Sequence, residues 1–303
     1  MIPLVPRLDR GGDPAASSWT EPAPAKINLA LHVTGRRADG YHLLDTLVAF
    51  PAIGDTLTMS PAPDLSLTVI GPFAGALGDT PAADNLVLRA ARLLAGTEAG
   101  RGGALTLDKH LPIASGIGGG SADAAAALRL LAPLWGQDVR APEMAALAAS
   151  LGADVPMCLL SRPARARGIG EILEPLAAPL PEAGVLLVNP GVAVATPDVF
   201  RALQSRDNPP LPDVPARFAR LSDLVGWMAT TRNDLETPAR LVAPVIGEVL
   251  ARLAALPGAR IARLSGSGAT CFALFDTVAA ASAGARALHG TEPGWWTAAA
   301  GWS

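Results

Sequence analysis

Apolar side chains recur along this chain with two different periods. Apolar and polar positions that alternate are typical of half-buried strands, and they predict strands at 27–33, 43–50, 55–59, 65–70, 103–107, 184–191, 260–264 and 271–275. Apolar positions three and four residues apart have the period of an α-helix, and they predict helices at 85–95, 144–151, 216–227, 234–256 and 278–288, with an alanine-rich helix after position 120. This mixed order of elements predicts an α+β fold.

The composition of the sequence changes after its midpoint. The segment "RPARARGIGEILEPL" is rich in arginine, and "DNPPLPDVPA" is a proline-rich connector between later helices. We place a domain boundary around Ser161 to Pro181, with a first domain at 21–165 and a second at 166–303. A chain of 303 residues more often forms two domains than one, so the simplest architecture is two α+β domains with a cleft between them. Residues 1–20 lack an apolar signal core, and we interpret them as a loose extension.

The segment "LPIASGIGGGSADAAAALRLL", residues 111–131, places glycines directly before the alanine-rich helix. It is neither a Walker A loop, because no lysine follows the glycines, nor a dinucleotide fingerprint, because Ser121 occupies the third glycine position. Glycine permits positive φ and close backbone approach, and Ser121 or Asp123 can cap the helix, whose free N–H groups attract an anion. The segment is therefore either a phosphate-binding loop or a tight turn packed before a buried helix.

Composition narrows the classes of ligand. A net charge of -3 and a pI near 5.8 give no broad basic face, so we expect small-molecule ligands and no nucleic acid. Charged residues interrupt the apolar stretches before they reach bilayer length, so no membrane span is predicted. Cys158 and Cys271 lie in apolar surroundings, which predicts buried reduced thiols and not a zinc site or a disulfide. These features predict a cytoplasmic protein.

Lysine occurs only at positions 26 and 109 among the 24 basic residues. Lysine is a compact point charge and arginine a flat fork, so the two are not interchangeable where a small oxygen must be approached. Lys26 directly precedes the strand at 27–33, and Lys109 lies shortly before the glycine loop. Both are candidates for substrate chemistry, and a solvated lysine at a strand end is the ordinary alternative for each.

Several segments resemble, in order and spacing, those of the GHMP kinases: "PAKINLALHVTGRRADGYHLLDT", "LPIASGIGGGSADAA", "GADVP", "GIGE", "TPDVF", "NDLE" and "LSGSGAT". The glycine loop and "SGSGAT" are similar to those of GHMP kinases generally. "GRRADGYH" joined to "PAKINL" resembles the branch that phosphorylates a cytidylated sugar alcohol. The resemblance covers about Pro22 to Phe275 and implies a two-domain kinase with its active site between the domains. It implies ATP-dependent phosphorylation of the 2-hydroxyl of 4-diphosphocytidyl-2-C-methyl-D-erythritol, in non-mevalonate isoprenoid synthesis.

The resemblance also implies roles for the residues at matching positions. Asp154 matches the general base, and Lys26 its partner. The residues that match ATP-binding positions are Asn85 for adenine, Gly116, Gly118, Gly119, Gly120 and Ser121 for the phosphates, and also Lys109 and Pro112. ATP implies Mg²⁺, but no carboxylate cluster in the sequence identifies its ligands.

On the acceptor side, the resemblance implies that the rings of Tyr41 and Phe200 sandwich the cytosine and that His42 hydrogen-bonds the base edge. Asn28, Thr196 and Asp154 match positions that reach the methylerythritol end. Each residue also has an ordinary alternative: a helix cap for Asn85, a turn for Asp154, a core aromatic for Phe200 and a structural histidine for His42.

Two other functions remain open. One is another GHMP kinase activity, on a sugar or isoprenoid alcohol, and the other is that of a non-catalytic nucleotide-binding relative. Ala122 departs from the serine or asparagine of many relatives, and the arginines of 162–167 stand where small residues are common. We expect a monomer or a weak homodimer.

Overall fold

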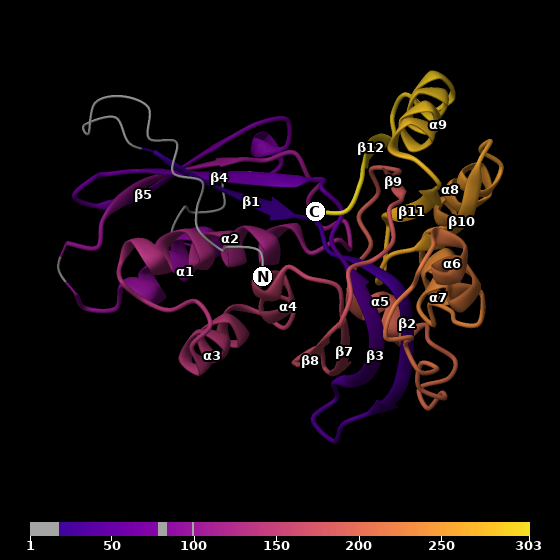
Figure 1. The fold of residues 1–303 in the computed structure, drawn as a ribbon, viewed down its shortest axis with the longest axis horizontal. Helices are drawn as coiled ribbons and strands as arrows, with labels where there is room; N and C mark the ends of the chain where they lie inside the picture. Colours follow the sequence, from indigo (N-terminus) through magenta and orange to yellow (C-terminus); the bar gives the residue numbers. More distant parts are fainter. Residues whose placement is uncertain (1–17, 78–83, 99) are drawn as a thin grey trace. The chain divides into compact units, whose positions relative to one another are not determined.

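The computed structural model describes residues 18–77, 84–98 and 100–303, and contacts within the chain divide it into two compact units (Figure 1). Unit 1 consists of the described parts of Met1–Pro24, Gly54–Ile113 and Gly119–Leu160. Unit 2 consists of Ala25–Ile53, Ala114–Gly118 and Ser161–Ser303.

Unit 1 is a four-stranded sheet with helices packed against it. The strand order is β1 (Trp19–Pro24), β4 (Gly54–Ser60), β6 (Gly103–Asp108) and β5 (Leu65–Ile70), and only the β5–β6 pair is parallel. Alternate residues of β4 and β6 are buried, which gives the sheet one apolar face. The helices of this unit are η2 (Ala74–Leu77), α1 (Leu86–Ala95), α2 (Gly119–Leu134), α3 (Pro142–Leu151) and α4 (Val155–Leu160). The alanine-rich α2 packs on β1, β4 and α1, which its small side chains allow it to approach closely.

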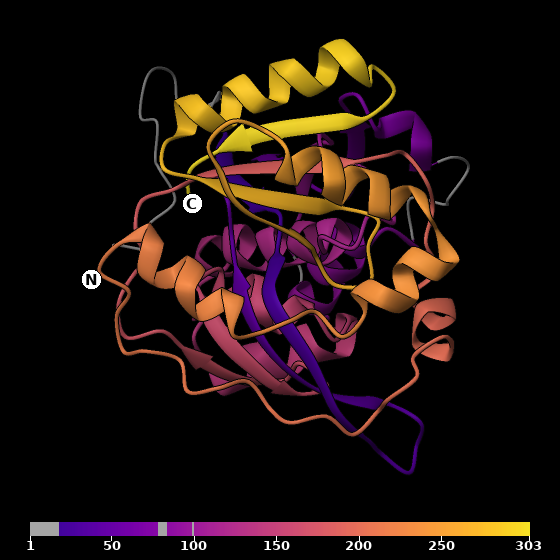
Figure 2. The same cartoon turned by 90° about the vertical axis from the view of Figure 1, so that its right-hand side faces the viewer.

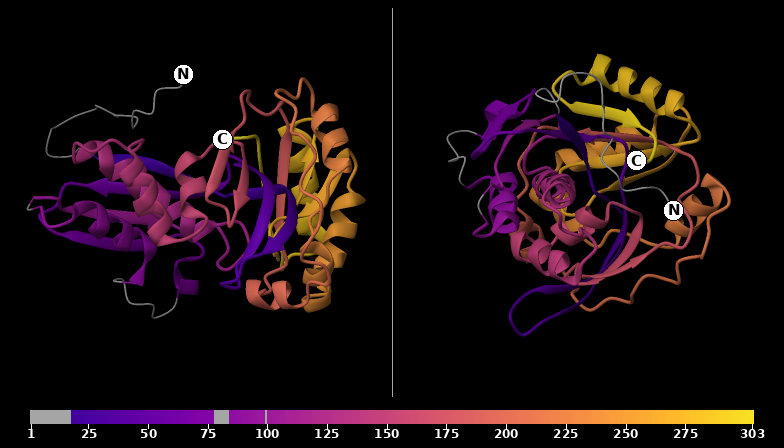
Figure 3. Two further views of the ribbon diagram at one scale, coloured as in Figure 1. Left: turned by 90° about the horizontal axis from the view of Figure 1, so that it is seen from below. Right: turned by 60° about the vertical axis from the view of Figure 1, so that its left-hand side comes forward.

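Unit 2 contains two antiparallel four-stranded sheets. The first has the order β2 (Ile27–Arg36), β3 (His42–Ala49), β7 (Ala164–Gly168) and β8 (Ile172–Pro175), and its β2–β3 hairpin is the indigo loop at the bottom of the right-hand view of Figure 3. The second has the order β10 (Ala259–Leu264), β11 (Cys271–Phe275), β9 (Gly184–Asn189) and β12 (Trp296–Ala300).

Figure 2 faces the second of these sheets, with α9 (Val278–Thr291) lying along β12 and α8 (Val245–Ala254) packed on β10 and β11. Every residue of β9 and β11 is buried, so these strands form the core of the unit. The other helices of unit 2 are α5 (Thr196–Arg201), α6 (Leu221–Ala229) and α7 (Glu236–Val242).

The α+β class is confirmed, and every strand that alternation predicts is present. Alternation missed β1, β7, β8 and β12. In β7, "ARARG", the buried positions are alanines and the outward ones arginines, so its apolar signal is weak. The predicted helix at 234–256 is two helices because Pro244 interrupts it, and the one predicted at 216–227 begins only at Leu221.

The contacts group some residues differently from the predicted domain limits. Residues 25–53 belong to unit 2, although they precede the predicted boundary, because β3 pairs with β7. Trp19 and Thr20, assigned above to a loose extension, pair with Met59 and Thr58 in the sheet of unit 1. The rest of that extension, up to residue 17, lies outside the described residues.

Two further expectations concern the thiols and the membrane. Cys158 and Cys271 are both buried and outside any disulfide, as predicted. None of the helices within residues 18–77, 84–98 and 100–303 is long and apolar enough to cross a membrane.

Candidate functional site

The first part of the glycine loop, Ala114–Gly118, belongs to unit 2 and packs tightly. Gly116 and Gly118 have φ angles of 76° and 68°, which favour glycine. A Cβ on Gly116 would lie 2.3 Å from the carbonyl oxygen of Gly268, in the second small-residue loop. The Thr270 amide also donates to Ser115 O at 3.1 Å. The tight-turn interpretation therefore holds for this half of the loop, where Gly116 is needed for contact with Gly268.

The same loop supports the strand that carries Lys26 and Asn28. The Lys26 amide donates to Ile117 O at 2.9 Å, and the Asn28 amide donates to Ser265 Oγ at 3.2 Å. Lys26 is only 6 % exposed, and its ammonium donates to Asn28 Oδ1 at 3.2 Å, while Asn28 Nδ2 donates to Thr46 Oγ1 at 2.8 Å. The structure thus brings together two predicted site residues and fixes the orientation of the Lys26 side chain.

Asp154, the predicted base, lies in unit 1 directly before α4 and is half-buried. Its carbonyl accepts from the Cys158 amide at 3.1 Å. The Arg129 guanidinium of α2 donates to Cys158 O at 2.6 Å and forms an ion pair with Glu21. Arg129 therefore ties the helix that follows Asp154 to the helix that follows the glycine loop.

The second part of the loop, from Gly119 onward, is the start of α2 in unit 1. The helix begins at Gly119, so the expectation that Ser121 or Asp123 caps it is wrong: the two glycines before Ser121 are already helical. The first N–H groups of a helix have no acceptor within it, so the start of α2 is suited to an anion. Pro112, buried, lies just before this loop.

Asn85 lies beside this helix start. A Cβ on Gly120 would be 3.5 Å from Leu86 Cδ1, so the first residues of α1 and α2 are neighbours. Asn85 caps α1 by accepting from the Val87 amide at 2.9 Å, as the ordinary alternative predicted. The cap uses the side-chain oxygen, and the amide nitrogen is the group that a base could accept from.

Lys109 lies in a buried cluster with two carboxylates. Its Nζ is 2.5 Å from Asp55 Oδ2 and 2.7 Å from Asp123 Oδ2, and all three residues are at most 4 % exposed. Asp55 Oδ1 accepts from the backbone amides of His110 and Leu111 at 2.6 and 2.8 Å. Burial lowers the pKa of Lys109, but Asp123 and Asp55 outweigh it, so the pKa is raised and the ammonium form is favoured.

The carboxylate of Asp123 accepts fewer hydrogen bonds than that of Asp55. Its Oδ1 is buried, with no hydrogen-bond partner among the described residues. Burial is the main cause that raises the pKa of Asp123 to about 7; Lys109 opposes it and Asp55 adds to it. From the sequence, Asp123 was expected only as a possible cap of the helix, and Asp55 was not identified as a site residue.

Three predicted acceptor residues of unit 2 have rings, and two of these rings stack on each other. The His42 and Phe200 rings stack with centroids 4.5 Å apart and planes at 20°, and Tyr41 at the tip of the β2–β3 hairpin is 60 % exposed. His42 Nε2 is buried without a partner in the described part of the chain. Burial lowers the pKa of His42, and Arg36 and Arg206 lower it further, so the neutral imidazole is favoured.

Thr196 and Phe200 lie one turn apart on α5 and hence on one face of it. Thr196 Oγ1 is 2.8 Å from the hydroxyl of Ser267. Sequence reasoning found the loop of Ser265 and Ser267 but assigned neither serine to the site. The signal was the position of both serines in "SGSGAT", and their contacts with Thr196 and Asn28 could come only from the fold.

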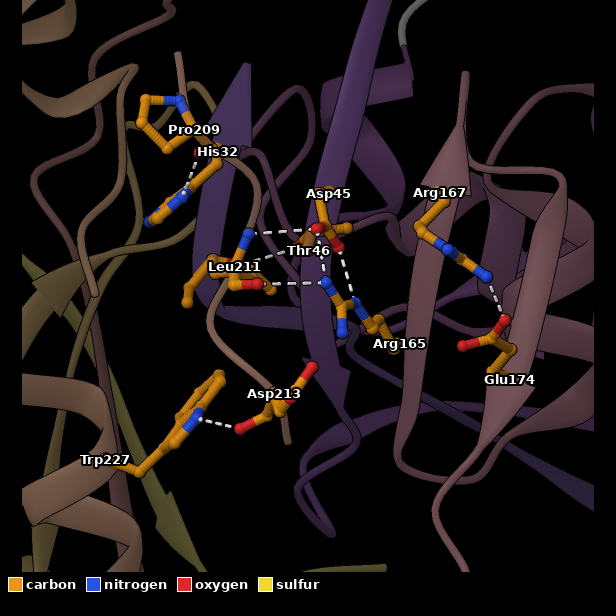
Figure 4. A network of polar contacts seen from close by, with 11 residues as sticks. His32, Asp45, Thr46, Arg165, Arg167, Glu174, Pro209, Leu211, Asp213 and Trp227 are labelled. Carbon is orange, nitrogen blue, oxygen red and sulfur yellow. Dashed lines mark hydrogen bonds and ion pairs between the residues drawn. The ribbon is translucent and has the colours of Figure 1, made fainter. Parts of the chain in front are cut away.

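A polar network anchors the strands that carry these residues (Figure 4). Asp45 of β3 accepts from the Arg165 guanidinium at 2.8 and 2.6 Å and from the Leu211 amide at 2.9 Å. His32 Nδ1 is 2.9 Å from Pro209 O. The arginine-rich segment and the proline-rich connector therefore hold β2 and β3 in place.

Comparisons with known proteins agree with this arrangement. The models for the GHMP kinases N terminal domain and the GHMP kinases C terminal match residues 85–162 and 215–292. The 4-diphosphocytidyl-2-C-methyl-D-erythritol kinase of Cereibacter sphaeroides (strain ATCC 17029 / ATH 2.4.9) is 58 % identical over 92 % of this chain and 97 % of its own length. The enzyme of the same name from Paracoccus denitrificans (strain Pd 1222) is 56 % identical over 93 % of this chain and 96 % of its own.

Solved structures give the same result. A crystal structure of 4-(cytidine 5'-diphospho)-2C-methyl-D-erythritol kinase matches with a TM-score of 0.75 and 37 % identity, over 93 % of this chain and 98 % of that one. The L. major mevalonate kinase, crystallised with R-mevalonate, matches with a TM-score of 0.63 and 17 % identity over 99 % of both chains, which shows the fold alone. The chain therefore belongs to the GHMP kinases and, within them, to the 4-diphosphocytidyl-2-C-methyl-D-erythritol kinase family.

Proposed function

We propose that this protein transfers the γ-phosphoryl group of ATP to the 2-hydroxyl of 4-diphosphocytidyl-2-C-methyl-D-erythritol, in the non-mevalonate route to isoprenoid precursors. The observation that carries the proposal is the stacked pair of His42 and Phe200, with its unpartnered imidazole nitrogen. Tyr41 precedes His42 in the chain, and we call the three residues the aromatic group. Mevalonate, homoserine and galactose contain no base, and would give these rings nothing to bind. The names and high identity of the relatives support the same acceptor.

The aromatic group suits cytosine in particular. A base stacked on an aromatic side chain gains about 1 to 3 kcal/mol, and Tyr41 and Phe200 would supply the two faces of a sandwich. A neutral imidazole has one donor and one acceptor nitrogen, and the cytosine edge offers an amine donor beside acceptors, so His42 can bind it as either tautomer. Thr196, on the same face of α5 as Phe200, and Asn28, beside the Lys26 ammonium, would bind the methylerythritol end.

For the nucleotide we assign the phosphates to the backbone of the glycine loop and the start of α2, and the adenine to Asn85. The free N–H groups at the start of α2 and the proximity of Leu86 to Gly120 support this assignment. The positions concerned are Pro112, Gly116, Gly118, Gly119, Gly120 and Ser121. Lys109 would act from beneath the loop, because its ammonium already binds two carboxylates.

For the chemistry, Asp154 would take the proton of the acceptor's 2-hydroxyl while the oxygen of that hydroxyl attacks the γ-phosphorus of ATP. The bond from that phosphorus to the β,γ-bridging oxygen breaks, and ADP leaves. The Lys26 ammonium, oriented by Asn28 Oδ1, would stabilise the negative charge that develops on the attacking oxygen.

ATP implies Mg²⁺, and we tested whether the side chains fit the ion. Within residues 18–77, 84–98 and 100–303, no group of three or more His, Cys, Asp or Glu side chains could hold a metal ion. The described side chains therefore form no all-protein cage for the ion. Magnesium in nucleotide sites is held mainly by phosphate oxygens and water with one or two carboxylates, and we derive no step through the ion. That the protein is cytoplasmic, a monomer or weak homodimer, and without nucleic-acid or membrane partners stays a prediction.

A coupled ADP-release assay tests the proposal, with the cytidylated methylerythritol beside mevalonate, homoserine and galactose as acceptors. We expect turnover with the cytidylated acceptor alone, and phosphorus NMR should place the new phosphate on its 2-oxygen. Turnover with another acceptor alone would identify a different GHMP kinase activity. ATP binding without turnover on any acceptor would identify a non-catalytic relative.

A further inference from the structure

The buried cluster of Lys109, Asp55 and Asp123 in unit 1 is not balanced in charge. One ammonium faces two carboxylates at 2.5 and 2.7 Å. Asp55 is fully satisfied, since it also accepts from two backbone amides. Asp123 Oδ1 is buried and accepts from none of the described residues. An ionised Asp123 thus leaves a buried negative charge with an unsatisfied oxygen, which is costly in a low-dielectric interior.

The cluster lies directly beneath the proposed phosphate site. A Cβ on Gly119, the first residue of α2, would be 3.3 Å from Lys109 Nζ. Asp123 lies four residues further along the same helix, whose free N–H groups face the phosphates in the proposed function. A net negative cluster at this distance repels an anion, and a neutral cluster does not. Nucleotide binding and protonation of the cluster should therefore favour each other.

We propose that Asp123 is a positioning residue of the nucleotide site that takes up a proton when the nucleotide phosphates bind at the start of α2. This inference rests on the proposed function, which puts the phosphates there. The proton comes from solvent and goes to the Asp123 carboxyl group, so the cluster changes from a net negative charge to neutral. Lys109 keeps its contacts with both side chains and stays beneath Gly119.

The electrostatic surroundings of Asp123 fit this role. Burial raises the pKa of Asp123 to about 7, so the carboxyl group exchanges a proton in the neutral range. The charged groups that face it are Lys109 and Asp55. Of the elements packed against α2, β1 carries Glu21, which pairs with Arg129, and α1 carries Arg89 and Arg92. Protonation is complete below this pKa and lost above it, so nucleotide affinity should fall as pH rises through about 7.

Isothermal titration of the full chain with ADP and magnesium tests the inference, at about pH 7.5 in two buffers of different ionisation enthalpy. The dependence of the heat on the buffer gives the number of protons taken up. For the wild type we expect uptake of most of a proton per nucleotide, and an affinity at about pH 6 that exceeds the affinity at about pH 8 by roughly 5- to 10-fold.

Asp123→Asn keeps an oxygen for Lys109 but cannot titrate. It should abolish the proton uptake while it retains the affinity that the wild type has at low pH, which a merely structural role would not produce. Asp198→Asn is the control: Asp198 is an exposed carboxylate of α5 paired with Arg201, and its loss should leave the uptake unchanged. Comparing each variant with the wild type also removes any protons that the nucleotide itself exchanges.

Wild-type binding without proton uptake, or full uptake in Asp123→Asn, would overturn the inference and leave the proposed function intact. Failure of the wild type to bind nucleotide at all would overturn the proposed function instead. If Asp123→Asn does not fold, the wild-type affinities at about pH 6 and pH 8 decide, because an affinity independent of pH contradicts the inference.

Discussion

The two units each contain one buried polar side-chain atom without a hydrogen-bond partner among the described residues: Asp123 Oδ1 in unit 1 and His42 Nε2 in unit 2. Burial favours the uncharged form of both groups. It raises the pKa of the Asp123 carboxyl and lowers the pKa of the His42 imidazole. In both units the unpartnered atom lies among residues that the proposed function assigns to ligand binding.

The surroundings of the two atoms differ. Asp123 lies among buried charges beneath a helix start, where an anion is expected. His42 stacks on Phe200 beside an exposed tyrosine, where a neutral base is expected. Acid should therefore strengthen binding at the first site and weaken it at the second. An unpartnered buried atom can indicate where a ligand binds, while the charge of that ligand decides how pH changes the affinity.

The largest expected effect tests whether the chemistry can be separated from both binding regions. Lys26→Ala or Asp154→Asn should lower kcat by about 100-fold or more, because general-base and charge effects act on the transition state. The affinities for ATP and for the cytidylated acceptor should both persist in titration calorimetry. Near-normal turnover in both variants would contradict the assignment of these residues.

The next effect concerns the aromatic group. Phe200→Ala should weaken acceptor binding by about 5- to 150-fold, which corresponds to roughly 1 to 3 kcal/mol of lost stacking, without change in ATP affinity. Tyr41→Ala combined with it should be non-additive, since the second ring holds a base that is no longer fixed from the other side. Binding constants from calorimetry give both results.

Trp295→Ala is the matched control for Phe200→Ala, because Trp295 is also partly buried against the same core cluster of unit 2. It should lower stability without selective loss of acceptor binding. Equal losses of acceptor affinity in the two variants would show that Phe200 acts through the core and not through the base.

Much of the fold was predictable because alternation and helical period are local signals. The alternation of the strands also indicates the charged cluster of Lys109, Asp55 and Asp123. Asp55 is in phase with the buried Leu57 of β4, and Lys109 is in phase with the buried Leu107 of β6, so both side chains point toward the core. A charge at an inward position of a strand is rare unless it is paired, and this phase could have identified the cluster.

Other features could not be predicted, because they depend on pairings between distant segments. The packing of Gly116 against Gly268 joins two loops that are far apart in the chain. The stacking of His42 on Phe200 joins a strand to a helix that the period did not predict, and α5 is too short for a clear pattern. The family resemblance supplied these site residues, and local pattern alone would not have.

A smaller effect tests the start of α2. Gly119→Ala should weaken ATP binding by about 10-fold, or ~1.4 kcal/mol, because its methyl group would displace the Lys109 ammonium beneath the phosphates. Acceptor affinity should not change. Gly290→Ala in α9, where an added Cβ meets no atom within 4 Å, is the control and should leave both affinities intact. A loss of thermal stability in Gly119→Ala at unchanged ATP affinity would instead favour a packing role for this glycine.

The smallest expected effect is the most direct test of the difference between Asp123 and His42. The pKa of His42 lies below its usual 6.5, so the neutral ring that binds cytosine is present above that value and is lost as pH falls through the lowered pKa. The acceptor KM should therefore rise by about 3-fold as pH falls from about 7.5 to about 5.5, while the ATP KM falls over the same range.

His42→Ala should flatten the pH profile of the acceptor KM alone. It should also reduce the preference for cytidine over uridine acceptors, since an unsatisfied polar edge rejects the wrong base. His289→Ala, which removes an exposed histidine of α9, should leave both profiles unchanged. If acid changed the two KM values in the same direction, a general effect on folding or on the acceptor's own phosphates would explain them better than two separate buried groups.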